Sequence, residues 1–252
     1  MSGLTGRRAL VTGASRNLGV DIAERLARGG LSVAVNYHSS PSAAHELVAR
    51  LEAETGRTHV AVGGDLTRAG EVADVVAAAA DGLGGNIDVL VNNAGPYGMT
   101  PFAEMNETEW DSVWDANVKA TYLAVREVVP GMRAAGWGRI INLSAVSAYV
   151  RNRSIYGLAK SAIVTLTEQL ALELAPEITV NALAPGQILE SLEDLGDFST
   201  DWAKKVTART PAGRLVTRTE LAELVYLLCT PAFTMVTGVT IPVDGGLRLP
   251  RF

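Results

Sequence analysis

Arg8-Ala-Leu-Val-Thr12, followed by Gly13-Ala-Ser-Arg-Asn-Leu-Gly19, decides the fold of this chain. The first five residues read as a short buried strand, and an amphipathic run from Val20 to Arg28 follows the glycines. A strand, a glycine-rich turn and a helix in this order open a dinucleotide-binding βαβ unit. Backbone N–H groups at the start of such a helix attract a pyrophosphate, so the stretch predicts a dinucleotide site near the amino terminus.

Apolar strand-like runs alternate with helix-period stretches along the rest of the chain. Gly29 and Gly30 end the first expected helix and Pro41 opens the second. Strands joined by helical crossovers build a parallel sheet, so we expect an α/β Rossmann fold: one doubly wound, seven-stranded sheet with helices on both faces. The expected strands are Arg8–Thr12, Ser32–Tyr37, His59–Val62, Ile87–Val91, Arg139–Leu143, Ile178–Ala182 and Thr240–Val243.

Composition agrees with a single domain spanning residues 1–252. Of these residues 48% are hydrophobic, which suits helices packed on both faces of a buried sheet. The formal net charge of −5, without a basic block, argues against a nucleic-acid partner. The one cysteine, Cys229, excludes an internal disulfide and lies in an apolar run typical of the core. No segment predicts a signal peptide or a membrane span, so we expect a cytoplasmic protein with no membrane partner.

Tyr156 and Lys160 stand four residues apart, and Ser144 lies a dozen residues upstream at the end of a strand-like run. Residues four apart share one face of a helix, so the lysine ammonium can sit beside the phenol. A nearby positive charge favours the phenolate and lowers the pKa of a tyrosine from its usual value of about 10. The trio suits proton transfer coupled to hydride transfer. A surface tyrosine stacked on a lysine stem is the alternative reading of this spacing.

Six motifs in order over most of the chain resemble the short-chain dehydrogenase/reductase family, most closely its 3-oxoacyl-carrier-protein reductases. They are Thr12–Gly19, Asn92-Asn-Ala-Gly95, Asn117, the Ser144-Tyr156-Lys160 set, Asn181-Ala-Leu-Ala-Pro-Gly186 and Val243-Asp-Gly-Gly246. Asn17 replaces the middle glycine of the family's loop; asparagine tolerates positive φ and is a favoured N-cap. Two departures are a Ser144–Tyr156 gap one residue shorter than the commonest spacing, and Gln187-Ile-Leu-Glu190 without the family's threonine.

The resemblance implies a catalytic tetrad of Asn117, Ser144, Tyr156 and Lys160, and no metal. Ser144 and Tyr156 would hold the carbonyl oxygen while hydride arrives from the nicotinamide; Tyr156 would then deliver the proton. Lys160 would bind the nicotinamide ribose and Asn117 a water. The expected cofactor-binding residues are Gly13, Ser15, Arg16, Asn17, Leu18, Gly19, Asn36, Tyr37, His38, Ser39, Asp65, Leu66, Asn93, Ala94, Gly95, Tyr156, Lys160, Pro185, Gly186 and Ile188.

The strand that ends at Tyr37 is followed by His38-Ser-Ser40, without the carboxylate that usually binds an adenosine ribose diol. Arg16 lies in the phosphate loop, and a guanidinium suits a 2′-phosphate. We therefore predict NADP(H) as cofactor. Asp65 is expected near the adenine amino group, or else as a cap of the helix that follows.

Residues 189–207 take the place of the family's substrate lid. Leu192, Leu195, Phe198 and Trp202 could line an apolar pocket with Tyr97, Met99 and Tyr149, or could pack the lid itself. The expected substrate is a small carbonyl or alcohol compound, or an acyl thioester such as a 3-oxoacyl-carrier-protein. The alternatives are a pteridine or sugar-alcohol reductase, or a protein that binds NADP as a sensor without turnover.

Two expected helices, Val118–Ala134 and Ile155–Ala175, are apolar around more of their circumference than one sheet face requires. Such a helix is buried on several sides. Relatives pair these helices across a two-fold axis, so we expect a homotetramer; burial within one chain is the alternative.

Overall fold

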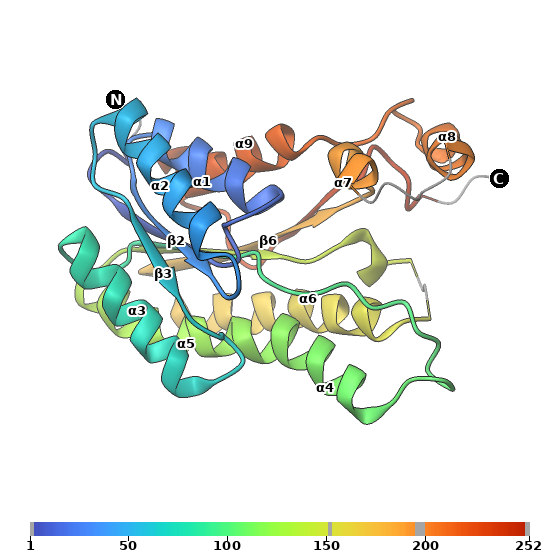
Figure 1. Cartoon of the computed structure of the whole chain (residues 1–252), viewed down its shortest axis with the longest axis horizontal. Coiled ribbons are helices and arrows are strands. Elements are labelled where there is room, and N and C mark those ends of the chain that lie inside the picture. Colours follow the sequence, from blue (N-terminus) through green and yellow to red (C-terminus); the bar gives the residue numbers. More distant parts are fainter. Residues whose placement is uncertain (1–2, 151–152, 195–199, 250–252) are drawn as a thin grey trace.

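The computed structural model describes residues 3–150, 153–194 and 200–249. A seven-stranded, all-parallel sheet of order β3-β2-β1-β4-β5-β6-β7 runs through the molecule, as expected (Figure 1). The order reverses between β1 and β4, which makes their carboxyl ends the switch point at which ligands bind in such sheets. The strands are β1 (Arg8–Val11), β2 (Ser32–Tyr37), β3 (Val60–Gly63), β4 (Val89–Asn92), β5 (Gly138–Leu143), β6 (Ile178–Pro185) and β7 (Thr240–Val243).

Helices cover both faces of the sheet (Figure 1). One layer holds α1 (Leu18–Arg28), α2 (Pro41–Thr55) and α9 (Arg218–Cys229); the other holds α3 (Ala69–Leu83), α5 (Ala120–Ala134) and α6 (Ile155–Leu174). Side chains alternate across a strand, and β1 divides its residues accordingly. Ala9 and Val11 enter the core under α1, whereas Leu10 enters the core over α3 and α5.

The shorter helices are α4 (Glu107–Trp114), α7 (Leu189–Asp194) and α8 (Thr200–Arg209), all toward one end of the molecule in Figure 1. A π-helical turn, Asp115–Lys119, joins α4 to α5, and 3-10 turns cover Val146–Ala148 and Pro231–Phe233. None of the helices in the described ranges is long and apolar enough to cross a membrane.

Several element boundaries differ from the sequence prediction; those of β1, β4, β5 and β6 do so by one to three residues. Two further differences have a reason in hydrogen bonding. β3 begins at Val60 rather than His59, because the His59 ring accepts the Val33 N–H at 3.1 Å where a strand backbone would have paired. The helix expected from Val118 begins regular α-geometry only at Ala120, after the π-turn that carries Asn117. π-turns inside helices are frequent at functional sites.

Candidate functional site: a glycine-rich loop, a tyrosine and a buried lysine

The glycine-rich loop after β1 is tied to the end of β4 through Thr12. The Thr12 hydroxyl accepts the N–H groups of Asn93 and Ala94 at 2.9 and 3.0 Å. In return the Asn93 amide donates to the carbonyls of Thr12 and Gly13 at 3.0 and 3.2 Å. These bonds join the two strands that flank the switch point, so the structure brings the loop and the Asn93–Gly95 segment together as predicted.

The start of α1 fits a pyrophosphate. A Cβ on Gly19 would stand 2.5 Å from the Gly13 carbonyl oxygen, so only glycine lets the helix approach the loop this closely. Asn17 has φ 52° and ψ −141°, which confirms the expected positive φ. Asn17 occupies the N-cap position of α1, as its residue type favours, but its side chain makes no capping hydrogen bond. First-turn N–H groups of a helix have no intrahelical acceptor, and here no Asn17 cap occupies them.

The segment at the end of β2 contains a buried residue that holds the loop in place and exposed residues that a ligand can reach. Asn36 is buried; its Oδ1 accepts the Gly13 N–H at 3.1 Å and its Nδ2 donates to the Val62 carbonyl at 3.2 Å. The Asn36 side chain therefore braces the loop, and the geometry does not support direct cofactor contact by it. The Tyr37 ring lies against Gly63, where a Cβ would meet it at 2.9 Å. His38, Ser39 and Arg16 are exposed beside this segment.

Asp65 follows β3 and turns the chain toward α3. Its Oδ1 accepts both the N–H and the hydroxyl of Thr67, at 3.0 and 2.8 Å. Burial alone would raise the pKa of Asp65, but these bonds, with His38 and Arg68, hold it below its ordinary value. The N-cap residue of α3 is Arg68 and not Asp65. Asp65 instead stabilises the turn that precedes the helix, through its hydrogen bonds to Thr67. Leu66 is buried in the core, which leaves its backbone as the part that can face a ligand.

Tyr156 and Lys160 lie in the first turns of α6. The Ser154 hydroxyl caps this helix by accepting the Gly157 N–H at 3.1 Å, which fixes where the Tyr156 side chain emerges. Lys160 Nζ is buried, lies 5.4 Å from the centre of the Tyr156 ring and donates to the Leu143 carbonyl at 2.7 Å. The two side chains are neighbours, as their spacing predicted.

The pKa of Tyr156 departs from the sequence prediction. Burial, and then the nearby Tyr97 phenol, raise the pKa of Tyr156 above its ordinary value. Burial also lowers the pKa of Lys160 to about 8. The expected lowering of the tyrosine pKa by the ammonium is not found in this structure. The ammonium is directed at the Leu143 carbonyl, and the phenol, in a half-buried side chain, is partly desolvated.

Ser144 is buried at the carboxyl end of β5, and its hydroxyl donates to the Lys160 carbonyl at 2.8 Å. A serine hydroxyl has one proton to donate. This bond ties the end of β5 to α6. The expected contact between the Ser144 hydroxyl and a substrate oxygen stays a prediction, since a hydroxyl can rotate toward a new acceptor.

Asn117 completes the group. Its Nδ2 donates to the carbonyls of Pro96 and Val113 at 3.1 and 2.9 Å. Its Oδ1 is buried and has no hydrogen-bond partner among the residues that the structure describes, a location that suits an ordered water. Gly95 has φ 152°, and a Cβ there would stand 2.3 Å from Asn117 Oδ1, so the close approach needs a glycine.

Sequence reasoning missed how close Tyr97 lies to this group. Its ring packs edge-on against Tyr156, with the ring centres 4.6 Å apart. The available signal was its position two residues after Gly95, since that segment passes Asn117. The prediction had assigned Tyr97 only to a pocket wall or to lid packing.

Known proteins are similar to this chain in sequence and in fold. The family model described as enoyl-(acyl carrier protein) reductase matches residues 13–248. The 3-oxoacyl-[acyl-carrier-protein] reductase FabG of Staphylococcus aureus is 36% identical over 246 residues, covering 96% of this chain and 98% of that protein. The corresponding reductase of Synechocystis is 36% identical over 252 residues, covering 98% and 99%.

Solved structures agree. A gluconate 5-dehydrogenase from Burkholderia cenocepacia, in complex with NADP and tartrate, has a TM-score of 0.90 at 30% identity and covers 98% of this chain and 97% of its own. A 7α-hydroxysteroid dehydrogenase complexed with NADH and 7-oxo glycochenodeoxycholic acid has a TM-score of 0.90 at 31% identity, with 96% and 94% covered. This chain belongs to the short-chain dehydrogenase/reductase family. It is an oxidoreductase that acts on CH–OH and C=O groups.

The remaining predicted contacts of this dehydrogenase follow β6. Pro185 ends the strand, and the Gly186 N–H donates to the Val243 carbonyl at 2.9 Å. Ile188 forms an isolated parallel bridge with Val216, and the Glu190 carboxylate accepts the Arg218 N–H at 3.1 and 3.2 Å. The first residues of the expected lid are thereby held against the start of α9.

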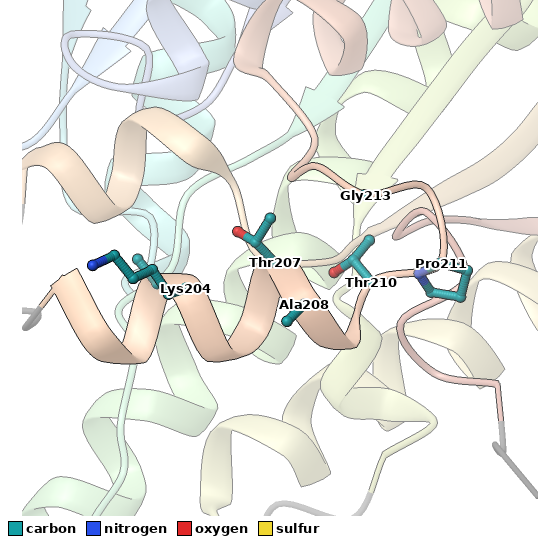
Figure 2. A pocket seen from close by; sticks show the side chains of 7 residues that line it. Lys204, Thr207, Ala208, Thr210, Pro211 and Gly213 are labelled. Atoms are coloured by element: carbon teal, nitrogen blue, oxygen red, sulfur yellow. The ribbon is translucent and has the colours of Figure 1, made fainter.

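The expected lid of the dehydrogenase consists of α7 and α8. Leu192 is buried, whereas Trp202, Tyr97, Met99 and Tyr149 are exposed; Leu195 and Phe198 lie outside the described residues. A hollow of about 610 Å³ lies along α8, lined by Lys204, Thr207 and Thr210 among others. Figure 2 shows how these side chains lie. None of the described residues expected to line the substrate pocket borders this hollow, so it is a separate feature of the lid surface.

Within the described ranges of the dehydrogenase, no three side chains of the His, Cys, Asp and Glu types are grouped to hold a metal ion.

Proposed function

We propose that this enzyme is an NADP(H)-dependent carbonyl reductase that interconverts a ketone and a secondary alcohol. The observation that carries the proposal is the half-buried Tyr156 ring beside the buried Lys160 ammonium, in the helix that follows the end of β5. The phosphate loop and Asn117 lie at the same edge of the sheet. A nicotinamide dinucleotide held by the loop would supply the hydride.

In this mechanism Tyr156 donates its proton to the substrate oxygen as the carbonyl carbon accepts a hydride with its electron pair. Its raised pKa keeps the phenol protonated near neutral pH, and this is the form needed for reduction. Oxidation of the alcohol would require the phenolate, which burial disfavours. The protonation state of the free enzyme thus suits the reduction step. Lys160 would bind the nicotinamide ribose, and the water at Asn117 Oδ1 would return a proton to the site.

Tyr156→Phe tests the assignment. It keeps the ring and removes the acid, so the rate of carbonyl reduction should fall by about 100-fold or more while the NADPH dissociation constant changes little. Steady-state turnover and fluorescence titration of NADPH measure the two quantities. Near-normal kcat in the variant would refute the role of Tyr156. Tight NADPH binding without turnover of any carbonyl by the parent enzyme would favour the sensor alternative.

We also propose that the cofactor is NADP(H) rather than NAD(H). Arg16, His38 and Ser39 are exposed around the phosphate loop, and no carboxylate follows β2 to repel a 2′-phosphate. The structural relatives named above include one in complex with NADP and one with NADH, so the family alone leaves the choice open.

The preference is measured as kcat/KM with NADPH against NADH. We expect NADPH to be favoured by at least about 10-fold, and Arg16→Ala to lower the NADPH value alone, since a single charged hydrogen bond contributes about 1.5–3 kcal/mol. Arg57→Ala, at a partly exposed arginine before β3, is the control and should leave both values unchanged. A parent enzyme that prefers NADH would overturn the proposal.

For the substrate we propose a 3-oxoacyl thioester, because the reductases of S. aureus and Synechocystis named above act on 3-oxoacyl-carrier-protein. A carrier protein is acidic and needs a basic docking surface. The candidates are Arg126, Arg133, Arg151 and Arg153. Arg126 is paired with Glu127 at 2.6 Å, Arg133 donates to the Glu173 carbonyl at 3.4 Å, Arg153 is exposed, and Arg151 lies outside the described residues. The assay therefore compares a free with a carrier-bound thioester.

Comparing acetoacetyl-CoA, the same group on a carrier protein, a diketone, a ketose and a pteridine would test this ranking. Highest kcat/KM with the ketose or the pteridine would support the alternative reductases instead.

We infer that residues 1–252 form one nucleotide-binding domain with 189–207 as its lid, and that four copies assemble. The support is the row of exposed apolar side chains on α5 and α6: Tyr122, Leu158 and Leu172.

A further inference from the structure

The turn that follows β7 carries a cation with unused hydrogen-bond donors. Arg248 lies four residues after Asp244, and its Nε stands 3.7 Å from the Asp244 carboxylate. A guanidinium carries N–H donors on its terminal nitrogens as well as on Nε. The terminal nitrogens of Arg248 make no hydrogen bond to any residue that the structure describes, and the side chain is 33% exposed. They are therefore within reach of a ligand.

The backbone that carries Arg248 is held in place. The Asp244 carboxylate, whose side chain is only 6% exposed, accepts the N–H groups of Gly246 and Arg248 at 2.9 and 3.0 Å. A Cβ on Gly246 would stand 2.9 Å from the Pro211 side chain, so the turn packs against the residues that follow α8. The turn after β7 is thus fixed beside the end of the lid helix.

The Arg248 side chain bridges the carboxyl ends of neighbouring strands. β5, β6 and β7 are adjacent and parallel, so these ends lie at one edge of the sheet. A Cβ on Gly186, which follows β6, would stand 2.9 Å from the Asp244 Cα. The guanidinium carbon lies 5.7 Å from the centre of the Tyr149 ring, after β5. The side chain therefore reaches from the end of β7 to the turn after β5, across the end of β6.

This edge of the sheet is where the proposed reaction takes place. The turn that carries Tyr149 is fixed to α6, where the Ser161 hydroxyl lies 3.2 Å from the Ala148 carbonyl. The same hydroxyl lies 2.9 Å from the carbonyl of Gly157, the residue after Tyr156. The end of β6 is the segment expected to contact the nicotinamide. Arg248 therefore lies on the lid side of the region in which a carbonyl group would be reduced.

A purely structural role does not account for the terminal nitrogens of Arg248. Asp244 approaches only Nε, and the ring of Tyr149 contacts the cation within the range of a cation–π interaction. Arg214 provides the contrast, since both of its terminal nitrogens donate to Glu220, at 2.8 and 2.5 Å. A guanidinium fixed on one side presents its free edge in the geometry that carboxylates and phosphates accept.

We propose that Arg248 binds an anionic group of the substrate, a carboxylate or a phosphate, and so selects for carbonyl compounds that carry one. The inference rests on the proposed carbonyl reductase function and names its class of substrate. In a 3-oxoacyl thioester of coenzyme A the group would be a phosphate, and in a free 3-oxo acid it would be the carboxylate. Arg248 would act in substrate binding and not in proton or hydride transfer.

Matched pairs of substrates test this role and separate the sources of the anion. Acetoacetyl-CoA is compared with acetoacetyl-N-acetylcysteamine, the same thioester without a phosphate. Acetoacetate is compared with acetylacetone, in which a methyl ketone replaces the carboxylate. We expect Arg248→Gln to lower kcat/KM for an anionic member by about 10-fold or more, mainly through KM, as for the loss of a charge-assisted hydrogen bond. The neutral members and the NADPH dissociation constant should be unaffected.

The pattern of loss identifies the group that Arg248 binds. Loss confined to acetoacetyl-CoA assigns the phosphate, and loss confined to acetoacetate assigns the carboxylate. Arg248→Lys should keep part of the preference, because an ammonium retains the charge but not the fork of donors. Lys204→Gln, which removes an exposed cation of α8, is the matched control and should leave the preference for the anionic members unchanged.

Three results would overturn the inference: equal effects of Arg248→Gln on neutral and anionic members, the same loss in Lys204→Gln, or a parent enzyme that reduces only the neutral members. Each would leave the proposed function standing if acetylacetone or the neutral thioester is reduced and Tyr156→Phe is inactive. A parent enzyme that reduces no carbonyl compound would overturn both.

Discussion

At the scale of single residues, Lys160 combines a buried ammonium with a short hydrogen bond. Its Nζ donates to the Leu143 carbonyl at 2.7 Å, and burial lowers its pKa to about 8. The amine is therefore protonated at neutral pH and loses its charge as the pH rises through about 8. The Tyr156 phenol keeps its proton over the same range, because its pKa is raised. A loss of activity near pH 8 can thus be assigned to the lysine.

We predict that the rate of carbonyl reduction falls above about pH 8, since the neutral amine no longer holds positive charge beside the phenol and the cofactor ribose. Lys160→Arg keeps a charge at all these pH values and should remove this basic limb, at a lower overall rate. Lys119→Arg, in which the replaced lysine is exposed and paired with Asp115 at 2.9 Å, should leave the limb in place. The dependence of kcat on pH from pH 6 to 10 measures this fall. The same fall above pH 8 in the Lys160→Arg variant would contradict the assignment to Lys160.

At the scale of elements, the joint between β2 and β3 depends on one buried imidazole. His59 Nδ1 accepts the Val33 N–H at 3.1 Å, so the neutral ring carries its proton on Nε2, which lies 2.9 Å from the Thr55 hydroxyl. Burial lowers the pKa of His59 from its ordinary value of 6.5; Glu52 opposes this shift and Arg57 adds to it. A protonated ring would direct an N–H at the Val33 N–H and break the joint.

Acid should therefore weaken this edge of the sheet. Because the folded-state pKa lies below the unfolded-state value, the contribution of His59 to stability is present above pH 6.5 and declines as the pH falls. The parent enzyme should lose more stability between pH 7.5 and 5.0 than His59→Gln, which has no titrating group there but loses about 1 kcal/mol at pH 7.5. Urea unfolding at both pH values measures the difference. Equal losses in the two proteins would exclude His59 as the cause.

At the scale of the whole molecule, the layer that contains α5 and α6 is left with apolar side chains in water. Leu158 is 44% and Leu172 79% exposed; fourteen residues apart, they lie on the same side of α6. Tyr122 of α5 is exposed as well. The opposite face of these helices packs on the sheet, so burial within one chain does not account for their apolar outer side.

If this surface joins copies of the chain, a charge on it should separate them. We predict a tetramer for the parent enzyme and a smaller species for the double variant Leu158→Asp, Leu172→Asp, by size exclusion with light scattering. Glu46→Lys, a charge change on exposed α2 in the other layer, should keep the parent mass. A monomeric parent enzyme would refute the proposed assembly.

Much of this molecule was determined by its sequence alone. The boundaries of β2 and β7 and the start of α2 at Pro41 agree with the prediction. The reason is that the spacing of apolar residues and the positions of proline and glycine act on the neighbouring backbone alone. The neighbourhood of Tyr156 and Lys160 follows from helical spacing. The phosphate loop is equally local, since a strand, a glycine turn and a helix dictate its shape.

Only the tertiary structure decided which hydrogen bonds the site residues make and how their pKa values shift. The hydrogen bond from the Ser144 hydroxyl to the Lys160 carbonyl and the contact of Tyr97 with Tyr156 both join different elements of the fold. No local sequence pattern encodes such contacts. The direction of the Tyr156 pKa shift depends on how much water remains around the phenol. Spacing places two side chains on one face of a helix, but packing from other elements determines what each of them can bind.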